Sequence, residues 1–122
     1  MEKERKEFIE KVKKRTKQLA IDVMLFYNEM HKTEVSRIIG KQMIRSVTST
    51  ASNYRAACVA RSQRDFYAKL SIVVEEADET LFWLEMLRDA RFTESKKVSP
   101  LIEENLELLK IVSKARKNSK SY

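Results

Sequence analysis

Histidine is the side chain that most limits the chemistry open to this chain. His31 is the single histidine among 122 residues, and it falls in a predicted turn between two helices. A di-iron centre in a four-helix bundle needs glutamates from two helices and a Glu-x-x-His motif from each of the other two, so one histidine cannot complete it. Ser-His or Cys-His catalysis would depend on His31 alone. The chain has no Gly-rich phosphate loop and no cysteine pair for zinc.

Four carboxylates lie close together in the sequence, at Glu75, Glu76, Asp78 and Glu79. With no imidazole beside them and no inward direction on their helix, they are typical of a solvated or interface surface rather than of a metal site. The lone Cys58 cannot form an intrachain disulfide and is typical of a small buried hydrophobe. We therefore predict that the protein is not an enzyme and uses no metal, cofactor or small-molecule substrate.

The composition indicates long helices in a single domain, residues 1–122. The chain has one Gly, one Pro and 35% charged residues, a mixture that suits uninterrupted helices. The N-terminus is charged rather than apolar, and no apolar stretch approaches the roughly 18 residues that a membrane span requires. We therefore expect an all-helical, soluble, cytoplasmic protein with no membrane partner, and the single cysteine fits a reducing compartment.

Apolar residues at three- and four-residue steps predict four helices, over residues 3–30, 35–60, 63–90 and 99–117. On the first helix the inward stripe comprises Phe8, Val12, Leu19, Val23, Phe26, Tyr27 and Met30. Either Thr33 or Ser36 is suited to cap the second helix. Four such helices joined by short connections predict an antiparallel up-down-up-down four-helix bundle.

Two further helix starts carry local signals. Ser62 followed by Asp65 resembles a capping box, which predicts the start of the third helix. Ser99 and Pro100 fit the N-cap and first helical position of the fourth helix, because proline lacks the N–H that is unsatisfied there. An earlier start of that helix near Thr93 is the alternative.

Several large apolar side chains fall on helix faces that point away from the predicted core. They are Ile72, Phe82, Trp83 and Met86 on the third helix and Ile21 and Leu25 on the first. Monomers rarely leave such a patch in water, and aromatic residues and Met are enriched in interface cores. We therefore predict that these residues form a homo-oligomer interface. The alternative is a wide core that takes them up.

Positive charge is concentrated at the two ends of the chain. Residues 1–20 hold eight basic and four acidic side chains, and five basic residues but no acidic one follow Glu107. In an up-down-up-down bundle these ends meet the turn between the second and third helices at one pole. The basic pole that we predict comprises Arg55, Arg61, Arg64, Lys114, Arg116 and Lys117. It suits RNA or DNA phosphates or an anionic protein, and the alternative is a solvated surface.

The second and third predicted helices are complementary in charge. Between Glu34 and Asp65 there are six basic residues and no acidic one. The third helix carries the acidic residues Glu75, Glu76, Asp78, Glu79, Glu85 and Asp89. The pairing is either internal to one chain or between neighbouring subunits, and it gives specificity more than strength.

The stretch from Arg45 to Leu87 resembles the bacterial four-helix-bundle family whose founding members are encoded by intervening sequences of 23S rRNA genes. The matching features are Arg45-Ser46, Ser49, Asn53-Tyr54-Arg55, Ser62, Asp65-Phe66, Lys69-Leu70-Ser71-Ile72, Glu76-Ala77-Asp78-Glu79-Thr80 and Trp83-Leu84. The resemblance implies a closed homopentamer without enzyme activity. Relatives include the accessory protein of diversity-generating retroelements, which resembles a basic, ring-shaped binder of nucleic acid and reverse transcriptase.

This chain departs from the pattern of those relatives at three positions. Ala56 and Arg61 stand where relatives commonly carry Glu, and Ala51 stands where they carry Gly. The first two changes make the basic pole more basic. We therefore expect a non-enzymatic, pentameric module that binds RNA or DNA, with a protein-interaction scaffold as the alternative. A ligand pocket on the bundle axis has only the polar interior residues Thr50 and Asn105 to support it.

Overall fold

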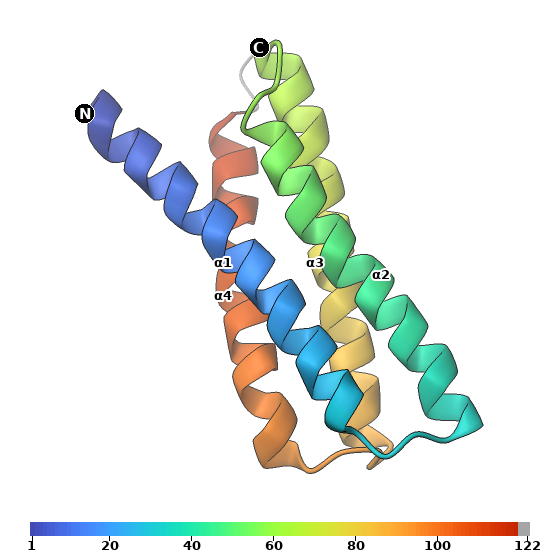
Figure 1. Ribbon diagram of the computed structural model, residues 1–122. Coiled ribbons are helices and arrows are strands. Elements are labelled where there is room, and N and C mark those ends of the chain that lie inside the picture. Colours follow the sequence, from blue (N-terminus) through green and yellow to red (C-terminus); the bar gives the residue numbers. More distant parts are fainter. Residues whose placement is uncertain (120–122) are drawn as a thin grey trace.

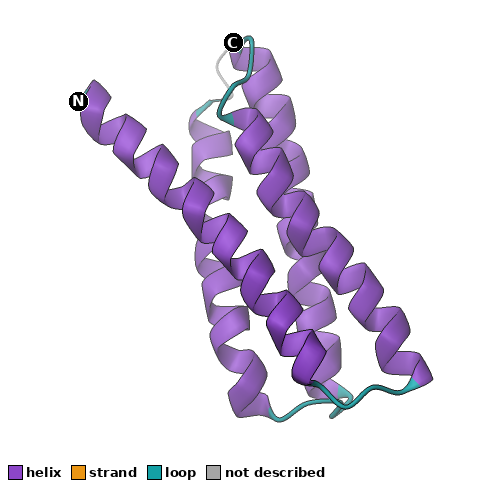
Figure 2. Ribbon diagram, in the orientation of Figure 1, coloured by secondary structure: helices purple, strands orange, loops and turns teal. Residues whose placement is uncertain are grey.

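Four long helices make up most of residues 1–119, which are the residues that the computed structural model describes (Figure 1). They are α1 (Glu2–Glu29), α2 (Glu34–Ala57), α3 (Gln63–Asp89) and α4 (Ser95–Asn118). Figure 2 shows only helices and loops over these residues. Each helix packs against its neighbours in sequence, and α1 also packs against α4, so that α1 and α3 lie diagonally opposite. The predicted all-helical, antiparallel four-helix bundle is confirmed.

The caps of α2 and α3 form as local sequence predicts, with one difference. Thr33 and Ser36 act together, since Thr33 Oγ1 accepts from the Ser36 N–H at 3.1 Å and Ser36 Oγ accepts from the Thr33 N–H at 2.8 Å. Ser62 Oγ accepts from the Asp65 N–H at 3.0 Å. The Asp65 carboxylate, however, accepts from the Arg61 N–H at 3.2 Å rather than from that of Ser62.

The predicted bounds of the second and fourth helices are wrong at one end each. The second helix ends at Ala57 rather than at residue 60. The fourth begins at Ser95, close to the alternative start, so Pro100 lies inside it. The proline cannot donate to the carbonyl of Lys96, which lies at an exposed position. Val98 is fully buried, and its packing explains why the helix begins before the proline.

One apolar core runs through all four helices. The largest fully buried apolar side chains are Val12, Val23, Met43, Val47, Leu70, Val73, Leu84, Leu87, Val98, Leu108 and Val112. Two buried polar contacts join neighbouring helices, from Thr80 Oγ1 to Ser46 Oγ at 2.9 Å and from Asn105 Nδ2 to the Ala77 carbonyl at 2.9 Å. Cys58 packs against this core, and burial raises the pKa of its thiol, in agreement with the hydrophobe predicted there.

The first turns of α1 separate from the rest of the bundle (Figure 1). Val12 is the first buried residue of the helix, and we call residues 2–11 the α1 arm. Phe8 was predicted to face the core, but it is 52% exposed because the arm diverges from α4 before reaching it. The apolar periodicity of α1 therefore extends toward the N-terminus beyond Val12, where packing of the helix against the core begins.

At the other end, α1 approaches α2 closely through Gly40. The ring of Tyr27 lies over this glycine, and a Cβ at position 40 would sit 2.6 Å from Cζ of the ring. Lys32 Nζ covers the same ring at 4.9 Å from its centroid. A glycine in a helix interior destabilises the helix by about 1 kcal/mol relative to alanine. We attribute its presence at position 40 to the close contact with the Tyr27 ring, which leaves no room for a Cβ atom.

Gly40→Ala tests whether this contact outweighs helix propensity. We expect the substitution to destabilise the fold by about 1 to 2 kcal/mol in urea unfolding followed by circular dichroism, because overpacking typically costs about 1 to 3 kcal/mol. In a Tyr27→Ala background the ring is gone, and the same change should stabilise the fold by up to about 1 kcal/mol. A stabilising effect in both backgrounds would show that Tyr27 does not restrict this position.

Candidate functional site

The structure brings the predicted basic pole to one end of the bundle. Arg55 lies in the last turn of α2, Arg61 in the turn that follows and Arg64 in the first turn of α3, while Lys114 and Lys117 lie in the last turns of α4. Figure 1 shows that the α2–α3 turn, the end of α4 and the start of α1 share this end. All five side chains are exposed.

Arg116 differs from the other members of the basic pole. Its guanidinium carbon lies 4.6 Å from the centroid of the Tyr67 ring, and its Nε donates to Ser71 Oγ at 2.7 Å. The side chain is half-buried and joins α4 to α3. Arg116 therefore has a structural role that its position in the sequence did not indicate, and its charge adds to the pole from a fixed position.

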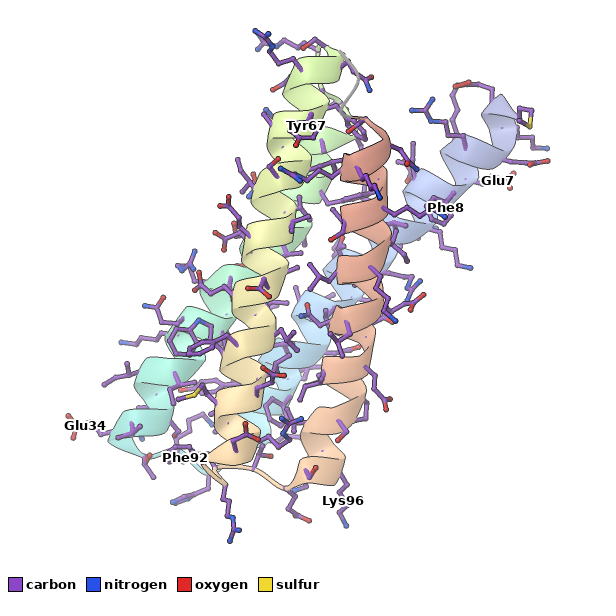
Figure 3. All side chains as sticks on the ribbon, turned by 180° about the vertical axis from the view of Figure 1, so that it is seen from behind. Glu7, Phe8, Glu34, Tyr67, Phe92 and Lys96 are labelled. Atoms are coloured by element: carbon purple, nitrogen blue, oxygen red, sulfur yellow. The ribbon has the colours of Figure 1, made fainter. Side chains whose placement is uncertain are left out.

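The N-terminal half of α1 adds cations beyond the six residues of the predicted basic pole. Arg5, Lys6 and Lys13 face Arg61 across a cleft of about 620 Å³ between α1 and the α2–α3 turn. A second cleft, of about 300 Å³, opens between the arm and α4, and Phe8 lines it. Figure 3 shows Phe8 on the arm, toward the same end as Tyr67 of α3. The high density of basic residues in 1–20 was the sequence feature that could have predicted these additional cations.

The outer apolar face predicted on α3 is exposed in the single chain. Ile72, Phe82 and Met86 are 41%, 51% and 38% exposed. Phe82 and Trp83 meet edge to face, with ring centroids 4.9 Å apart. Trp83 itself is half-buried against the core, and its indole N–H donates to Glu79 Oε2 at 2.9 Å. Phe82 is thus the most exposed member of the face, and Trp83 is the most buried.

Ile21 and Leu25 do not join this face, because α1 and α3 are diagonal. Ile21 is half-buried in a groove of about 540 Å³ between α1 and α2. The groove is bordered by the small residues Ala20, Thr48, Ala51 and Ser52 and by the basic residues Lys13, Lys14, Lys17 and Arg55. Leu25 is exposed and lines a different cavity, of about 520 Å³, at the opposite end. The predicted interface residues therefore lie on three separate surfaces.

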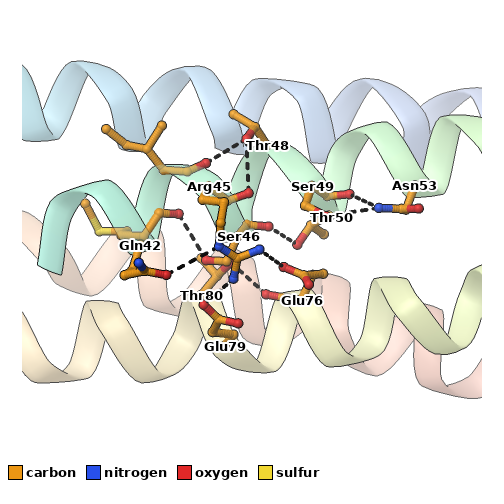
Figure 4. Close-up of polar contacts among 12 residues, drawn as sticks. Gln42, Arg45, Ser46, Thr48, Ser49, Thr50, Asn53, Glu76, Glu79 and Thr80 are labelled. Atoms are coloured by element: carbon orange, nitrogen blue, oxygen red, sulfur yellow. Dashed lines mark hydrogen bonds and ion pairs between the residues drawn. The ribbon is translucent and has the colours of Figure 1, made fainter. Parts of the chain in front are cut away.

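Charge pairing between α2 and α3 is internal at Arg45. Its guanidinium bonds both Glu76, at 3.2 Å, and Glu79 (Figure 4). The hydrogen bond from Trp83 and then that from Arg45 lower the pKa of Glu79, while the Glu79 bond raises the pKa of Arg45. Of the two predicted alternatives, the one within a single chain holds for this pair.

Glu79→Gln tests how far this cluster stabilises the fold. A carboxylate whose pKa is lower in the folded chain stabilises it above its unfolded pKa, near 4.5, and loses that contribution as pH falls through its folded pKa. The substitution should lower the free energy of unfolding by less than about 1 kcal/mol near neutral pH, since the pair is partly solvated. In urea unfolding the difference should disappear in acid, once the pH lies below the folded pKa of Glu79.

Glu103→Gln is the control, because Glu103 is an exposed carboxylate of α4 outside the Arg45 cluster. It should leave unfolding unchanged at both pH values. A stability difference for Glu79→Gln that persisted at acid pH would contradict an ionic role for Glu79.

Three further features of residues 1–119 bear on function, namely possible metal-binding groups, the surroundings of the single histidine and possible membrane-spanning helices. Within them no group of three or more His, Cys, Asp or Glu side chains is placed to hold a metal ion. His31 lines the cavity at the end opposite the basic pole, together with Glu29, Glu94 and Lys97. None of the helices in this part of the chain is long and apolar enough to cross a membrane.

Together the fold and these surfaces define a class, the antiparallel four-helix bundle with one basic end and an exposed apolar face on its third helix. Residues 10–114 match the family model of the 23S rRNA-intervening sequence protein, so the chain belongs to that family. No curated protein matches the sequence.

A solved structure with a similar fold comes from Bacteroides thetaiotaomicron. It is a crystal structure of a protein with unknown function from the S23 ribosomal protein family, and it is 30% identical to this chain. The match covers 87% of this chain and 98% of the other, with a TM-score of 0.78. Family membership and fold agree with the resemblance found in the sequence.

Proposed function

We propose that this protein is a non-enzymatic, homopentameric binding module that engages RNA or DNA phosphates through its basic pole. The observation that carries the proposal is the meeting of three separate basic segments at one end of the bundle. These segments are the start of α1 with Arg5 and Lys6, the α2–α3 turn with Arg61 and Arg64, and the end of α4 with Lys114 and Lys117. A focused positive potential raises the local concentration of polyanions and accelerates their association.

The pentamer is supported by two surfaces that complement each other. A closed ring of more than two subunits needs a heterologous contact between two different surfaces. The outer apolar face of α3 protrudes at Phe82 and carries exposed acidic residues such as Glu75 and Asp78. The α1–α2 groove is concave, has small residues along it and carries Lys14 and Lys17. An apolar projection with acidic surroundings thus suits a groove with basic surroundings on the next copy.

The second candidate function is a protein-interaction scaffold that does not bind nucleic acid. It is favoured by the cavity at the end opposite the basic pole, where Phe26, Phe92 and Leu101 lie beside Asp22 and Glu94. In that function the positive charge of the basic pole only steers association with an acidic partner.

Charge reversal at Arg61 and Arg64 discriminates between the two functions. The unchanged protein should bind structured RNA with an affinity that falls steeply with salt, because neutralised phosphates release counterions. Arg61→Glu with Arg64→Glu should weaken binding by roughly tenfold or more and reduce the salt slope in magnitude by roughly 1 to 2. Fluorescence anisotropy at a series of salt concentrations measures both quantities.

Arg37→Glu with Lys41→Glu is the control, since these exposed residues of α2 lie away from the basic pole and the net charge changes equally. That variant should retain most of the affinity. Equal losses in the two variants would indicate attraction by net charge alone, and salt-independent RNA binding would contradict the proposal.

Phe82→Glu tests the oligomer. Light scattering on a sizing column should give the mass of five 14.4 kDa chains for the unchanged protein. The variant should elute as a helical monomer, because a charge would be buried in an apolar interface while the core stays intact. Phe82 is a better position for this test than Trp83, because the half-buried Trp83 ring also packs against the core and its substitution would affect folding as well as assembly.

Leu106→Glu on α4 provides the comparison, as Leu106 is exposed at 39% but belongs to neither complementary surface. It should remain assembled. If Phe82→Glu also stayed fully assembled, the outer apolar face would not be the subunit contact.

A further inference from the structure

The α1 arm creates two clefts that share a common wall. Arg5, Ile9, Gln63 and Phe66 line both the 620 Å³ cleft beside the α2–α3 turn and the 300 Å³ cleft beside α4. The arm therefore lies between two clefts, at the end of the bundle that also holds the α2–α3 turn and the end of α4 (Figure 1). Volumes of about 300 to 1,000 Å³ are typical of sites for small organic groups.

The walls of these clefts are apolar and partly aromatic. Phe66 is half-buried and lines both clefts, and Tyr54 and Ile111 line the smaller one. Phe8 contributes a ring that is 52% exposed, on an arm that makes no use of it in the core. An exposed aromatic ring beside an apolar cleft suits a flat aromatic group.

The rim of the larger cleft is predominantly cationic. Arg5, Lys6 and Arg61 border it, and within residues 1–119 their side chains form no ion pair. Lys13 borders it too, but bonds Glu10 at 3.2 Å. Glu2 is the remaining acidic residue of the rim. Three cations are thus available to an anion that follows the edge of the cleft.

A nucleotide combines the two chemistries that this site offers, a flat aromatic base and an anionic phosphate. We propose that the clefts beside the α1 arm accept unpaired bases of single-stranded nucleic acid, with the base stacked on Phe8 and the adjacent phosphates on Arg5, Lys6 and Arg61. The inference rests on the proposed function and refines it, because phosphate contacts alone would not distinguish a single strand from a duplex. Stacking is tolerant of sequence, since every base has a π-face.

Three probes of equal length separate base stacking from charge. They are a labelled oligouridylate, a single strand with abasic sites in place of its bases and a blunt duplex. The unchanged chain should bind oligouridylate roughly tenfold more tightly than the abasic strand, which is within the range of base–aromatic stacking. Equal affinity for the two single strands would overturn the inference.

Substitutions at Phe8 identify the ring responsible. Phe8→Ala and Phe8→Leu should both remove the roughly tenfold preference over the abasic strand, whereas Phe8→Trp should keep it. The variants should fold, because Phe8 precedes the first buried residue of α1. Ile38→Ala, at an exposed apolar residue of α2, is the control and should leave the preference unchanged. A preference that survives Phe8→Ala and Phe8→Leu would also overturn the inference.

Failure of this inference is distinguishable from failure of the proposed function. Arg61→Glu should weaken binding of the normal and abasic strands alike, because both carry phosphates. If all three probes bind equally and with the same salt dependence, the proposed function stands and base stacking is excluded. If none binds, both fail.

Cys58 gives an independent readout of occupancy. It is the single cysteine of the chain and lines the larger cleft. Bound oligouridylate should slow alkylation of its thiol by a maleimide by several-fold, and the abasic strand should protect it less. No protection at saturating oligouridylate would place the strand outside the larger cleft and would contradict the contact proposed between its phosphates and Arg61.

Discussion

The arrangement of this molecule depends on the shortness of its connections. Residues 30–33, 58–62 and 90–94 join the four helices. Links of this length force consecutive helices to run antiparallel and side by side. The start of α1, the α2–α3 turn and the end of α4 therefore meet at one end, and these are the segments in which the sequence concentrates basic residues. The bundle topology thus brings the basic residues together from segments that are distant in sequence, and no single local motif predicts the basic pole.

The internal pairing of α2 with α3 decides which surfaces remain available for partners. Arg45 occupies two carboxylates of α3, and Thr80 and Ser46 join the same helices within the core. These contacts fix the rotation of α3 about its own axis. The same rotation leaves Phe82 in solvent, next to Trp83, whose indole is bound to Glu79. The outer apolar face is thus a consequence of how the acidic side of α3 satisfies its charges.

Features encoded by neighbouring residues could be predicted from sequence, while features set by distant packing could not. The caps at Thr33 and Ser62 and the bundle topology follow from local patterns and short links. The start of α4 could not be predicted from local patterns, because burial of Val98 outweighs the preference of Pro100 for the first turn of a helix. The exposure of Phe8 and the stacking of Arg116 on Tyr67 also depend on where another helix lies, which periodicity does not contain.

The packing of α1 from Val12 onward gives its arm the mechanics of a lever. Val12 is fully buried in the core, and Arg15 is bonded to Glu104 of α4 at 2.7 and 2.9 Å. Glu2 lies ten residues from Val12, about 15 Å along the helix axis. A tilt of about ten degrees about Val12 would displace the tip by about 2.6 Å for this length. The width of the clefts beside the arm therefore depends on the direction in which α1 leaves the core at Val12, and a small change of that direction is amplified where the basic residues lie.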